Sequence, residues 1–309
     1  MRKTDQVTLF PPHLQVKPFI KWAGGKGQLV NYIHGKYPSE LGKSINKYAE
    51  PFIGAGAILF DILNNFILDS IYVSDTNKEL INLYLIIKNN VIQLIDNLKL
   101  LQNDYISKDT EQRKIYYYEK RDIYNSLITC HTSQNSIEKA ALFIFLNRTC
   151  FNGLYRVNAR GLFNVPMGAY KNPTICDEDN LINVSKVLGK VQIICADYRE
   201  SANFIDEHTF VYFDPPYRPL TTTANFNSYT ELDFNDDSQR ELSHFAASMS
   251  ERNAKIMVSN SDPKNSDPND NFFDNLYSQF KISRIPAKRL INRNSAQRGT
   301  INELLICNY

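Results

Sequence analysis

The sequence has little of several features that would assign a protein to a class at once. No apolar segment follows the amino-terminal Met1-Arg2-Lys3, so we expect no signal peptide, and the apolar run at 140–146 is far too short to span a membrane. The 5 cysteines are scattered without a Cys-x-x-Cys pair, and the 5 histidines lack metal-ligand spacing. This pattern argues against a disulfide framework and a zinc site, and it favours a reducing, cytoplasmic compartment.

An excess of one charge is also missing, because 35 Lys and Arg residues face 33 Asp and Glu residues and leave a net charge of +2. The 309 residues are 43% hydrophobic, which is enough for a sizeable core in one large or two modest domains. The basic residues are unevenly spread: 1–48, 139–176 and 275–302 hold 8, 5 and 6 of them against 2, 0 and 0 acidic residues. These three blocks form either separate solvated faces or one positive cleft for nucleic acid.

Apolar periodicity predicts an α/β sheet interrupted by an inserted domain. Strands and helices alternate at both ends of the chain, around a helical and irregular middle. The expected strands are 45–52, 70–74, 191–196, 210–213 and 255–259, with 280–285 and 304–308 as a closing antiparallel pair. The expected helices are 57–64, 79–88, 94–125, 137–146 and 237–250, and the expected loops are 147–172 and 261–271.

A glycine-rich turn follows the first expected strand. The stretch Glu50-Pro51-Phe52-Ile53-Gly54-Ala55-Gly56 leads into a helix, and glycines at such a turn let the backbone approach a bound ligand closely. Asp75 ends the next strand, where a carboxylate can accept hydrogen bonds from ribose hydroxyls. Leu59 occupies the place of the third glycine of a dinucleotide fingerprint, so a nucleoside fits better than NAD. A tight turn without a ligand is the alternative.

The most specific motif is Asp214-Pro215-Pro216-Tyr217, which comes directly after the apolar run 210–213. Asp214 therefore lies at the carboxyl edge of the predicted sheet, where ligand sites of α/β proteins form. The two prolines remove two backbone donors and stiffen the turn, so a carboxylate and a rigid carbonyl can together accept the hydrogens of an amino group. Tyr217 adds an aromatic face. The alternative is a proline turn capped by an aspartate.

Four motifs, in this order along the chain, resemble those of the alpha-class adenine-specific DNA methyltransferases, the Dam and DpnII-type modification methylases. They are 17–26 (KPFIKWAGGK), 50–56 (EPFIGAG), 147–158 (NRTCFNGLYRVN) with its continuation through 163–166 and 170–173, and 214–217 (DPPY). The third motif resembles the target-recognition segment of enzymes that modify adenine in GATC. The resemblance spans nearly the whole chain, from about Lys17 to Tyr309.

The resemblance implies a Rossmann-like, S-adenosylmethionine-dependent methyltransferase sheet with an inserted, mainly helical target-recognition domain. The catalytic domain would comprise 1–92 and 185–309, and the recognition domain 93–184. The implied reaction moves a methyl group from S-adenosylmethionine to N6 of an adenine flipped out of double-stranded DNA, within GATC, and leaves S-adenosylhomocysteine without using a metal. We expect a cytoplasmic, DNA-associated enzyme that needs no membrane and no obligate protein partner, acting either beside a cognate restriction endonuclease or alone.

The resemblance also implies a role for individual residues. Catalysis would fall to Asp214, Pro215, Pro216 and Tyr217. The cofactor would be held by Trp22, Lys26, Glu50, Pro51, Phe52, Gly54, Gly56, Asp75, Asp197, Tyr198 and Asp214. DNA would be contacted by Lys21, Phe151, Asn152, Leu154, Arg156, Pro166 and Tyr170, and we expect Lys21, Arg156 and some of Lys288, Arg289, Arg293 and Arg298 to line one positive cleft.

Two other interpretations compete with this one. An amino-group methyltransferase acting on cytosine, RNA or a protein glutamine would share much of the pattern, although cytosine enzymes usually resemble it with Ser, and glutamine enzymes with Asn, in place of Asp214. A DNA-binding relative that has lost the chemistry is the second, and the intact Asp214, Pro215 and Tyr217 argue against it.

Overall fold

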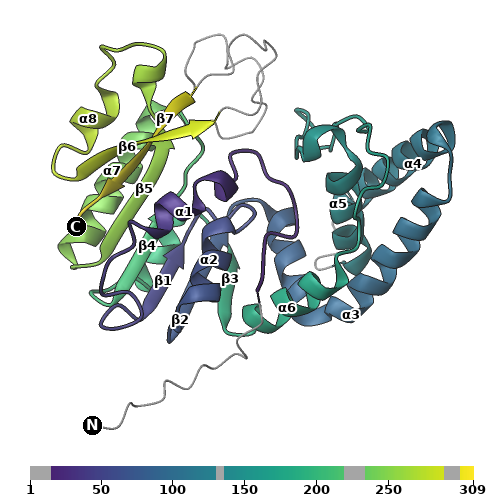
Figure 1. The fold of residues 1–309 in the computed structure, drawn as a ribbon, viewed down its shortest axis with the longest axis horizontal. Helices are drawn as coiled ribbons and strands as arrows, with labels where there is room; N and C mark the ends of the chain where they lie inside the picture. Colours follow the sequence, from purple (N-terminus) through teal and green to yellow (C-terminus); the bar gives the residue numbers. More distant parts are fainter. Residues whose placement is uncertain (1–14, 130–135, 219–233, 289–299) are drawn as a thin grey trace, which may run out of the picture.

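The computed structural model describes residues 15–129, 136–218, 234–288 and 300–309 (Figure 1). The expected DNA-binding residues Arg289, Arg293 and Arg298 lie outside these residues, and for Lys288 only the backbone is described.

Seven strands form one sheet in the order β3-β2-β1-β4-β5-β7-β6. Neighbouring strands from β3 to β5 are parallel, while β7 pairs antiparallel with both β5 and β6. The strands are β1 (Lys47–Glu50), β2 (Ser70–Asp75), β3 (Val191–Cys195), β4 (Thr209–Phe213), β5 (Lys255–Ser261), β6 (Lys281–Lys288) and β7 (Thr300–Cys307). The expected strands and the antiparallel closing pair are thus confirmed.

Both faces of the sheet are buried, and the alternation of side chains along β4 shows how. Phe210 and Tyr212 pack in one apolar cluster with helices α1 and α2, whereas Val211 and Phe213 pack in a second cluster with α7 and α8. These helices are α1 (Val30–His34), α2 (Ala57–Asn65), α7 (Asp236–Glu251) and α8 (Phe272–Leu276). The result is a three-layer α/β fold of the predicted class.

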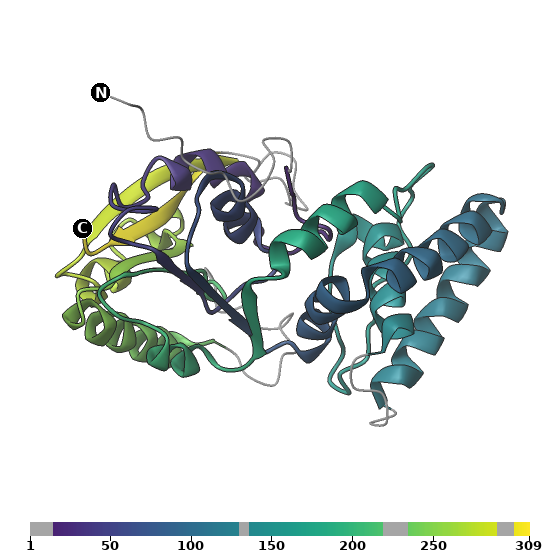
Figure 2. The ribbon, with the colours of Figure 1, turned by 90° about the horizontal axis from the view of Figure 1, so that it is seen from below.

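The described residues between β2 and β3 form four helices: α3 (Lys78–Ile106), α4 (Thr110–Thr129), α5 (Ile137–Thr149) and α6 (Glu178–Leu188). The first part of α3 contacts β2 and β3, and α3 also packs against α5 and α6. Figures 1 and 2 both show α4 and α5 beside the far part of α3, away from the sheet. The division of the chain at 92/93 and 184/185 stays a prediction, and a kink at Asn90 in α3 lies close to the first of these positions.

The helix predictions were wrong in two places. The segment 94–125 is divided between α3 and α4 rather than being one element, and α6 was not predicted. The expected loop 261–271 is also more ordered than predicted, because it starts within β5 and holds a short 3-10 helix, η5 (Pro263–Asn265), beside the buried Asp262. The other 3-10 helices within the described ranges are η1 (Lys26–Gln28), η2 (Phe151–Gly153) and η3 (Tyr198–Asn203).

The described residues contain neither a helix that could span a membrane nor a cluster of side chains that could hold a metal ion. None of their helices is both long and apolar enough to cross a membrane. They also contain no group of three or more His, Cys, Asp or Glu side chains arranged to hold a metal ion.

Candidate active site

The glycine-rich turn packs tightly against its neighbours at the end of β1. Gly54 and Gly56 both have positive φ, 48° and 70°. A Cβ at Gly54 would lie 3.0 Å from the Trp22 indole, and one at Gly56 would lie 2.6 Å from the Tyr84 hydroxyl. Both positions therefore need glycine for the backbone conformation and for the space beside it.

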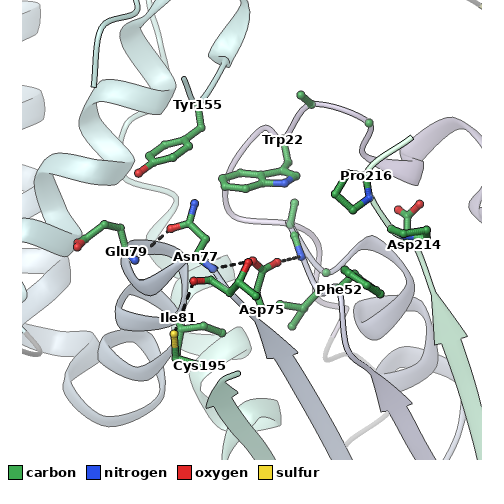
Figure 3. A pocket seen from close by; sticks show the side chains of 18 of the residues that line it. Trp22, Phe52, Asp75, Asn77, Glu79, Ile81, Tyr155, Cys195, Asp214 and Pro216 are labelled. Carbon is green, nitrogen blue, oxygen red and sulfur yellow. Dashed lines mark hydrogen bonds between the residues drawn. The ribbon is translucent and has the colours of Figure 1, made fainter. Parts of the chain in front are cut away.

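The turn forms one wall of a cavity of about 1750 Å³ at the carboxyl ends of the parallel strands (Figure 3). This volume exceeds the ~300–1000 Å³ of a typical small-molecule pocket, so it has room for more than one ligand group. All four expected catalytic residues line the cavity, as do all expected cofactor residues except Pro51. Of the expected DNA-binding residues, only Arg156 lines it.

Asp75, at the end of β2, supports the turn from below. Its carboxylate accepts hydrogen bonds from the backbone N–H of Gly54 at 3.2 Å and of Asn77 at 2.9 Å (Figure 3). Burial raises the pKa of the Asp75 carboxyl, and the backbone donors oppose that shift. Because each carboxylate oxygen has two lone pairs, both oxygens can still accept a hydrogen bond from a ligand hydroxyl.

Glu50 is a buried acid at the same edge of the sheet. Its side chain is 2% exposed and accepts a hydrogen bond from the Tyr48 hydroxyl at 2.7 Å. Burial raises the pKa of Glu50 to about 8, with the Tyr48 hydroxyl acting in the opposite direction. At neutral pH this carboxyl is therefore mainly protonated, and a cationic ligand group would favour its ionised form.

Aromatic rings form two further walls. Phe52 stacks on Tyr198 with centroids 5.5 Å apart, at the side where η3 follows Asp197. Trp22 stacks on Tyr155 with centroids 5.4 Å apart and an interplanar angle of 19°. Flat apolar faces of this kind suit the rings of a nucleoside or a base.

Asp214 follows β4 and is held by residues from two distant parts of the chain. The Lys26 ammonium lies 2.5 and 2.6 Å from its two oxygens, and the Ser259 hydroxyl donates to Oδ1 at 2.8 Å. Ser259 in turn accepts a hydrogen bond from the Tyr212 hydroxyl at 2.9 Å. A carboxylate offers about four lone-pair sites, so after these contacts one site on Oδ2 is left for a ligand.

The remaining residues of the motif are fixed as well. The Tyr217 hydroxyl donates to Glu303 at 2.6 Å, and the Lys26 ammonium lies 4.6 Å from the centre of the Tyr217 ring. Gln239 donates to the carbonyl of Pro216 at 3.0 Å. Among the described residues no donor contacts the Pro215 carbonyl, which keeps it available as an acceptor.

Lys26 was expected to bind a cofactor, and its observed contacts are to the catalytic motif. Its side chain is 3% exposed and also donates to the Gly24 carbonyl at 2.9 Å. It still lines the cavity, so contact with a ligand remains compatible with this position.

Sequence reasoning did not find Ser259 or Glu303. Ser259 lies in β5, which pairs with β4, and Glu303 lies in β7, which pairs with β5. Both pairings are long-range, and neither residue lies in a motif. A weak signal exists for Glu303: it is the first acidic residue after the basic block 275–302, and it directly precedes the apolar run 304–307.

Six of the expected DNA-binding residues lie in the segment that follows α5, and Lys21 packs against this segment. Phe151 is 52% exposed, and Asn152 has a φ of 56°, which is unusual for a residue other than glycine. The Arg156 guanidinium bonds to the side chain of Asn164 at 2.7 Å, so its direction is fixed within the segment. The Pro166 carbonyl accepts the Phe151 N–H at 2.8 Å, and the Leu154 side chain is half-buried.

Lys21 lies against this segment although it is more than 100 residues away in sequence. Its ammonium contacts the Tyr170 hydroxyl at 3.2 Å, and its methylene groups occupy the space beside Gly153. The buried Asn147 side chain bonds to both the N–H and the C=O of Lys21, at 2.9 and 2.8 Å, and to the Gly153 carbonyl. The amino-terminal and recognition motifs are thus held together by specific hydrogen bonds.

The fold and cavity define an α/β protein whose ligand site lies at the carboxyl ends of its parallel strands. The model of the family described as D12 class N6 adenine-specific DNA methyltransferase matches residues 22–291. The chain belongs to this family, and it is therefore an adenine-specific DNA methyltransferase.

Three relatives illustrate the similarity. The chain is 46% identical to the Type II methyltransferase M.MjaIII of Methanocaldococcus jannaschii, over 96% of this chain and 100% of that protein. It is 36% identical to the Type II methyltransferase M1.LlaDCHI of Lactococcus lactis subsp. cremoris, over 96% of each. It is 34% identical to the DNA adenine methylase of Haemophilus influenzae, over 95% of this chain and 94% of that protein.

Proposed function

We propose that this enzyme transfers a methyl group from S-adenosylmethionine to N6 of an adenine flipped out of duplex DNA, within the sequence GATC. The observation that carries the proposal is that one cavity is lined by both the glycine-rich turn and the segment from Asp214 to Tyr217. A cofactor and an extruded base can therefore occupy adjoining parts of a single site.

The residues at one end of the cavity fit S-adenosylmethionine. The backbone at Gly54 and Gly56 leaves room for a ligand but not for a side chain, and the carboxylate of Asp75 can accept ribose hydroxyls. Trp22 and Phe52 offer aromatic faces for the adenine ring of the cofactor. When bound, the cofactor supplies an electrophilic methyl group on a positively charged sulfur.

The residues at the other end fit a target adenine. The amino nitrogen of adenine is a weak nucleophile because its lone pair is delocalised into the ring. Asp214 Oδ2 and the Pro215 carbonyl, each with acceptor capacity to spare, would take its two hydrogens and shift the nitrogen towards tetrahedral geometry. This restores the lone pair to the nitrogen, so the gain comes from positioning and electrostatic complementarity to the transition state.

Removing the base from the duplex costs a few kcal/mol. Stacking on Tyr217, worth ~1–3 kcal/mol for one base, would offset much of that cost. The hydrogen bond from Tyr217 to Glu303 fixes the ring in advance, so little further ordering is needed.

Sequence reading would fall to the segment after α5. Arg156 is held by Asn164 and can form a bidentate contact with guanine, worth about 1–3 kcal/mol of discrimination against other bases. Phe151 is exposed enough to enter a base step, and Lys21 reaches the same surface from the amino-terminal motif. The relatives named DNA adenine methylase support adenine as the methylated base, and the GATC target rests on the resemblance of the segment 147–158.

The test is incubation of the protein and S-adenosylmethionine with unmethylated duplex DNA, followed by mapping of the modified base and its sequence context. We expect N6-methyladenine in GATC. Asp214→Ala should abolish methylation while leaving binding to the duplex largely intact. Methylation of cytosine, methylation only of RNA or protein, or full activity of the Asp214 variant would refute the proposal.

A matched pair of variants tests the reading residue. Arg156→Ala should increase methylation at near-cognate sites relative to GATC, whereas Arg160→Ala, an exposed arginine of the same segment, should not. A uniform loss of binding to all sequences on Arg156→Ala would contradict its assignment as a base-reading residue.

A further inference from the structure

The cofactor end of the cavity and the DNA-reading segment share one side chain, Tyr155. Its ring stacks on Trp22, and both rings lie nearly parallel to Phe143 of α5, with centroids 5.0 and 6.4 Å from it. Figure 3 shows Tyr155 and Trp22 facing the same cavity. Burial raises the pKa of the Tyr155 hydroxyl to about 12, so the ring is neutral and its effect is one of packing.

Trp22 connects this aromatic cluster to the glycine-rich turn. The indole lies so close to Gly54 that a Cβ there would be 3.0 Å from it. A ligand that settles on the turn must therefore fix the position of Trp22, and through the stack it also fixes the position of Tyr155.

On its other side Tyr155 is covalently linked to the residues that face DNA. It stands between Leu154 and Arg156, and both Tyr155 and Arg156 line the cavity. The chain then doubles back, with Val157 bridging Phe163 and the Asn164 N–H donating to the Arg156 carbonyl at 3.1 Å. Tyr155 is thus stacked on Trp22, while the adjoining Arg156 is exposed to solvent where it lines the same cavity.

A second contact makes the connection rigid. Lys21 packs on Gly153 while its neighbour Trp22 packs on Tyr155, so two consecutive residues of the amino-terminal motif touch the recognition segment two residues apart. Asn147 ties the Lys21 backbone to the same segment. Because the junction is held at these points, a shift of Trp22 moves Tyr155 and the recognition segment with it.

We propose that Tyr155 is a positioning residue that couples occupancy of the cofactor site to the placement of Arg156, so that cofactor and target DNA bind cooperatively. This inference rests on the proposed function of the two sites. Coupling between two sites is reciprocal, and values of 1–3 kcal/mol correspond to about 5- to 150-fold in affinity.

The experiment measures the affinity of the full-length protein for S-adenosylhomocysteine, which binds without turnover. It is measured alone, with a duplex carrying the mapped target site, and with a duplex in which that site is scrambled. We expect the target duplex to tighten binding at least fivefold in the wild type and in Tyr155→Phe, which keeps the ring. In Tyr155→Leu the ratio should fall to about one. The control Tyr116→Leu, which removes a buried ring of α4 outside the cavity, should behave as the wild type.

The outcomes separate the two proposals. If the wild type neither binds S-adenosylhomocysteine nor methylates DNA, the proposed function fails. If the wild type methylates DNA but shows no coupling, or if Tyr155→Leu keeps the wild-type ratio, only the coupling role of Tyr155 is refuted. Should the leucine variant not fold, Tyr155→Met tests the same contact, because a flexible thioether fills the space without a flat ring.

Discussion

The ion pair between Lys26 and Asp214 permits a prediction in depth, because its two partners differ in their access to water. The Lys26 side chain is 3% exposed and that of Asp214 is 19% exposed. Removing one partner of a buried ion pair costs about 3–5 kcal/mol, chiefly because the other charge is left unpaired. We therefore predict unequal costs for Lys26→Met and Asp214→Asn.

Lys26→Met leaves a carboxylate that keeps the Ser259 hydroxyl and has some contact with water. The free energy of unfolding of the Lys26→Met variant should therefore fall by about 3 kcal/mol, the lower end of the range. Asp214→Asn leaves an almost fully buried ammonium with the Gly24 carbonyl and the Tyr217 ring, and should cost about 5 kcal/mol. The double variant has no unpaired charge and should be more stable than the sum of the two costs predicts.

The assay is urea unfolding, followed by circular dichroism and by fluorescence of Trp22, the only tryptophan of the chain. The exposed pair Lys17–Asp177 supplies the control, since Lys17→Met should change stability by less than ~1 kcal/mol. If the costs of Lys26→Met and Asp214→Asn add within ~0.5 kcal/mol in the double variant, the two charges do not stabilise each other and the reasoning is refuted.

Three further predictions concern the walls of the cavity. Gly56→Ala should lower the free energy of unfolding by more than ~1 kcal/mol, because an L-residue at φ 70° is strained and its Cβ would displace the Tyr84 hydroxyl. The same change should weaken cofactor binding, which calorimetry measures. Burial raises the pKa of Glu50 from 4.5 to about 8, so the folded protein holds this proton more tightly than the unfolded chain does. The stability that Glu50 contributes is therefore lost as pH rises between these two values. Glu50→Gln should flatten that dependence in unfolding measured at pH 5 and pH 8, and an unchanged slope would assign it to other groups. Tyr217→Phe should lower the single-turnover methylation rate less than tenfold because the stacking face is kept, whereas Tyr217→Ala should lose that face, worth ~1–3 kcal/mol per base; equal losses would assign the effect to the bond with Glu303.

The strands could be predicted because each is a short apolar run that ends at punctuation. The run before Asp214 has side chains buried on both faces, which a central parallel strand requires and which periodicity detects without knowledge of its neighbours. Strand order is a different matter, because it depends on contacts between distant segments. The position of β7 between β5 and β6 follows from such contacts, and the sequence analysis did not assign it.

The two errors in the helices have local causes. At the break between α3 and α4, the Asp109 side chain accepts the Gln112 N–H while the Gln112 side chain accepts the Asp109 N–H. This reciprocal capping is a recognised start signal of a helix, but it lies within a polar, Tyr-rich stretch whose helical spacing continues across it. In α6 the buried Leu181, Val184 and Leu188 recur at helical spacing, which is a signal for the helix that was not predicted.

The candidate site likewise combines residues that a motif predicts with residues that only the strand order brings into place. Motifs supply its backbone turns, since Gly54, Gly56 and the two prolines act through their own conformation. The hydrogen bonds that orient Asp214 and Tyr217 come instead from Ser259 and Glu303, which the sheet brings into place. Local chemistry can be predicted from a motif, whereas the residues that position it require the strand order.

The basic residues of the first two blocks of the sequence have different tasks. Of the three motif lysines in the first block, Lys26 is buried against Asp214, Lys17 pairs with Asp177, and Lys21 reaches the recognition segment. In the second, Arg148 donates to the Phe19 carbonyl and so secures the amino-terminal motif, while Arg156 stays exposed. Basic residues close together in sequence are therefore divided between holding the fold and forming the exposed surface that we propose to contact DNA. It follows that the salt dependence of DNA binding should report only the exposed members, and that counting charges in each block overestimates the number of phosphate contacts.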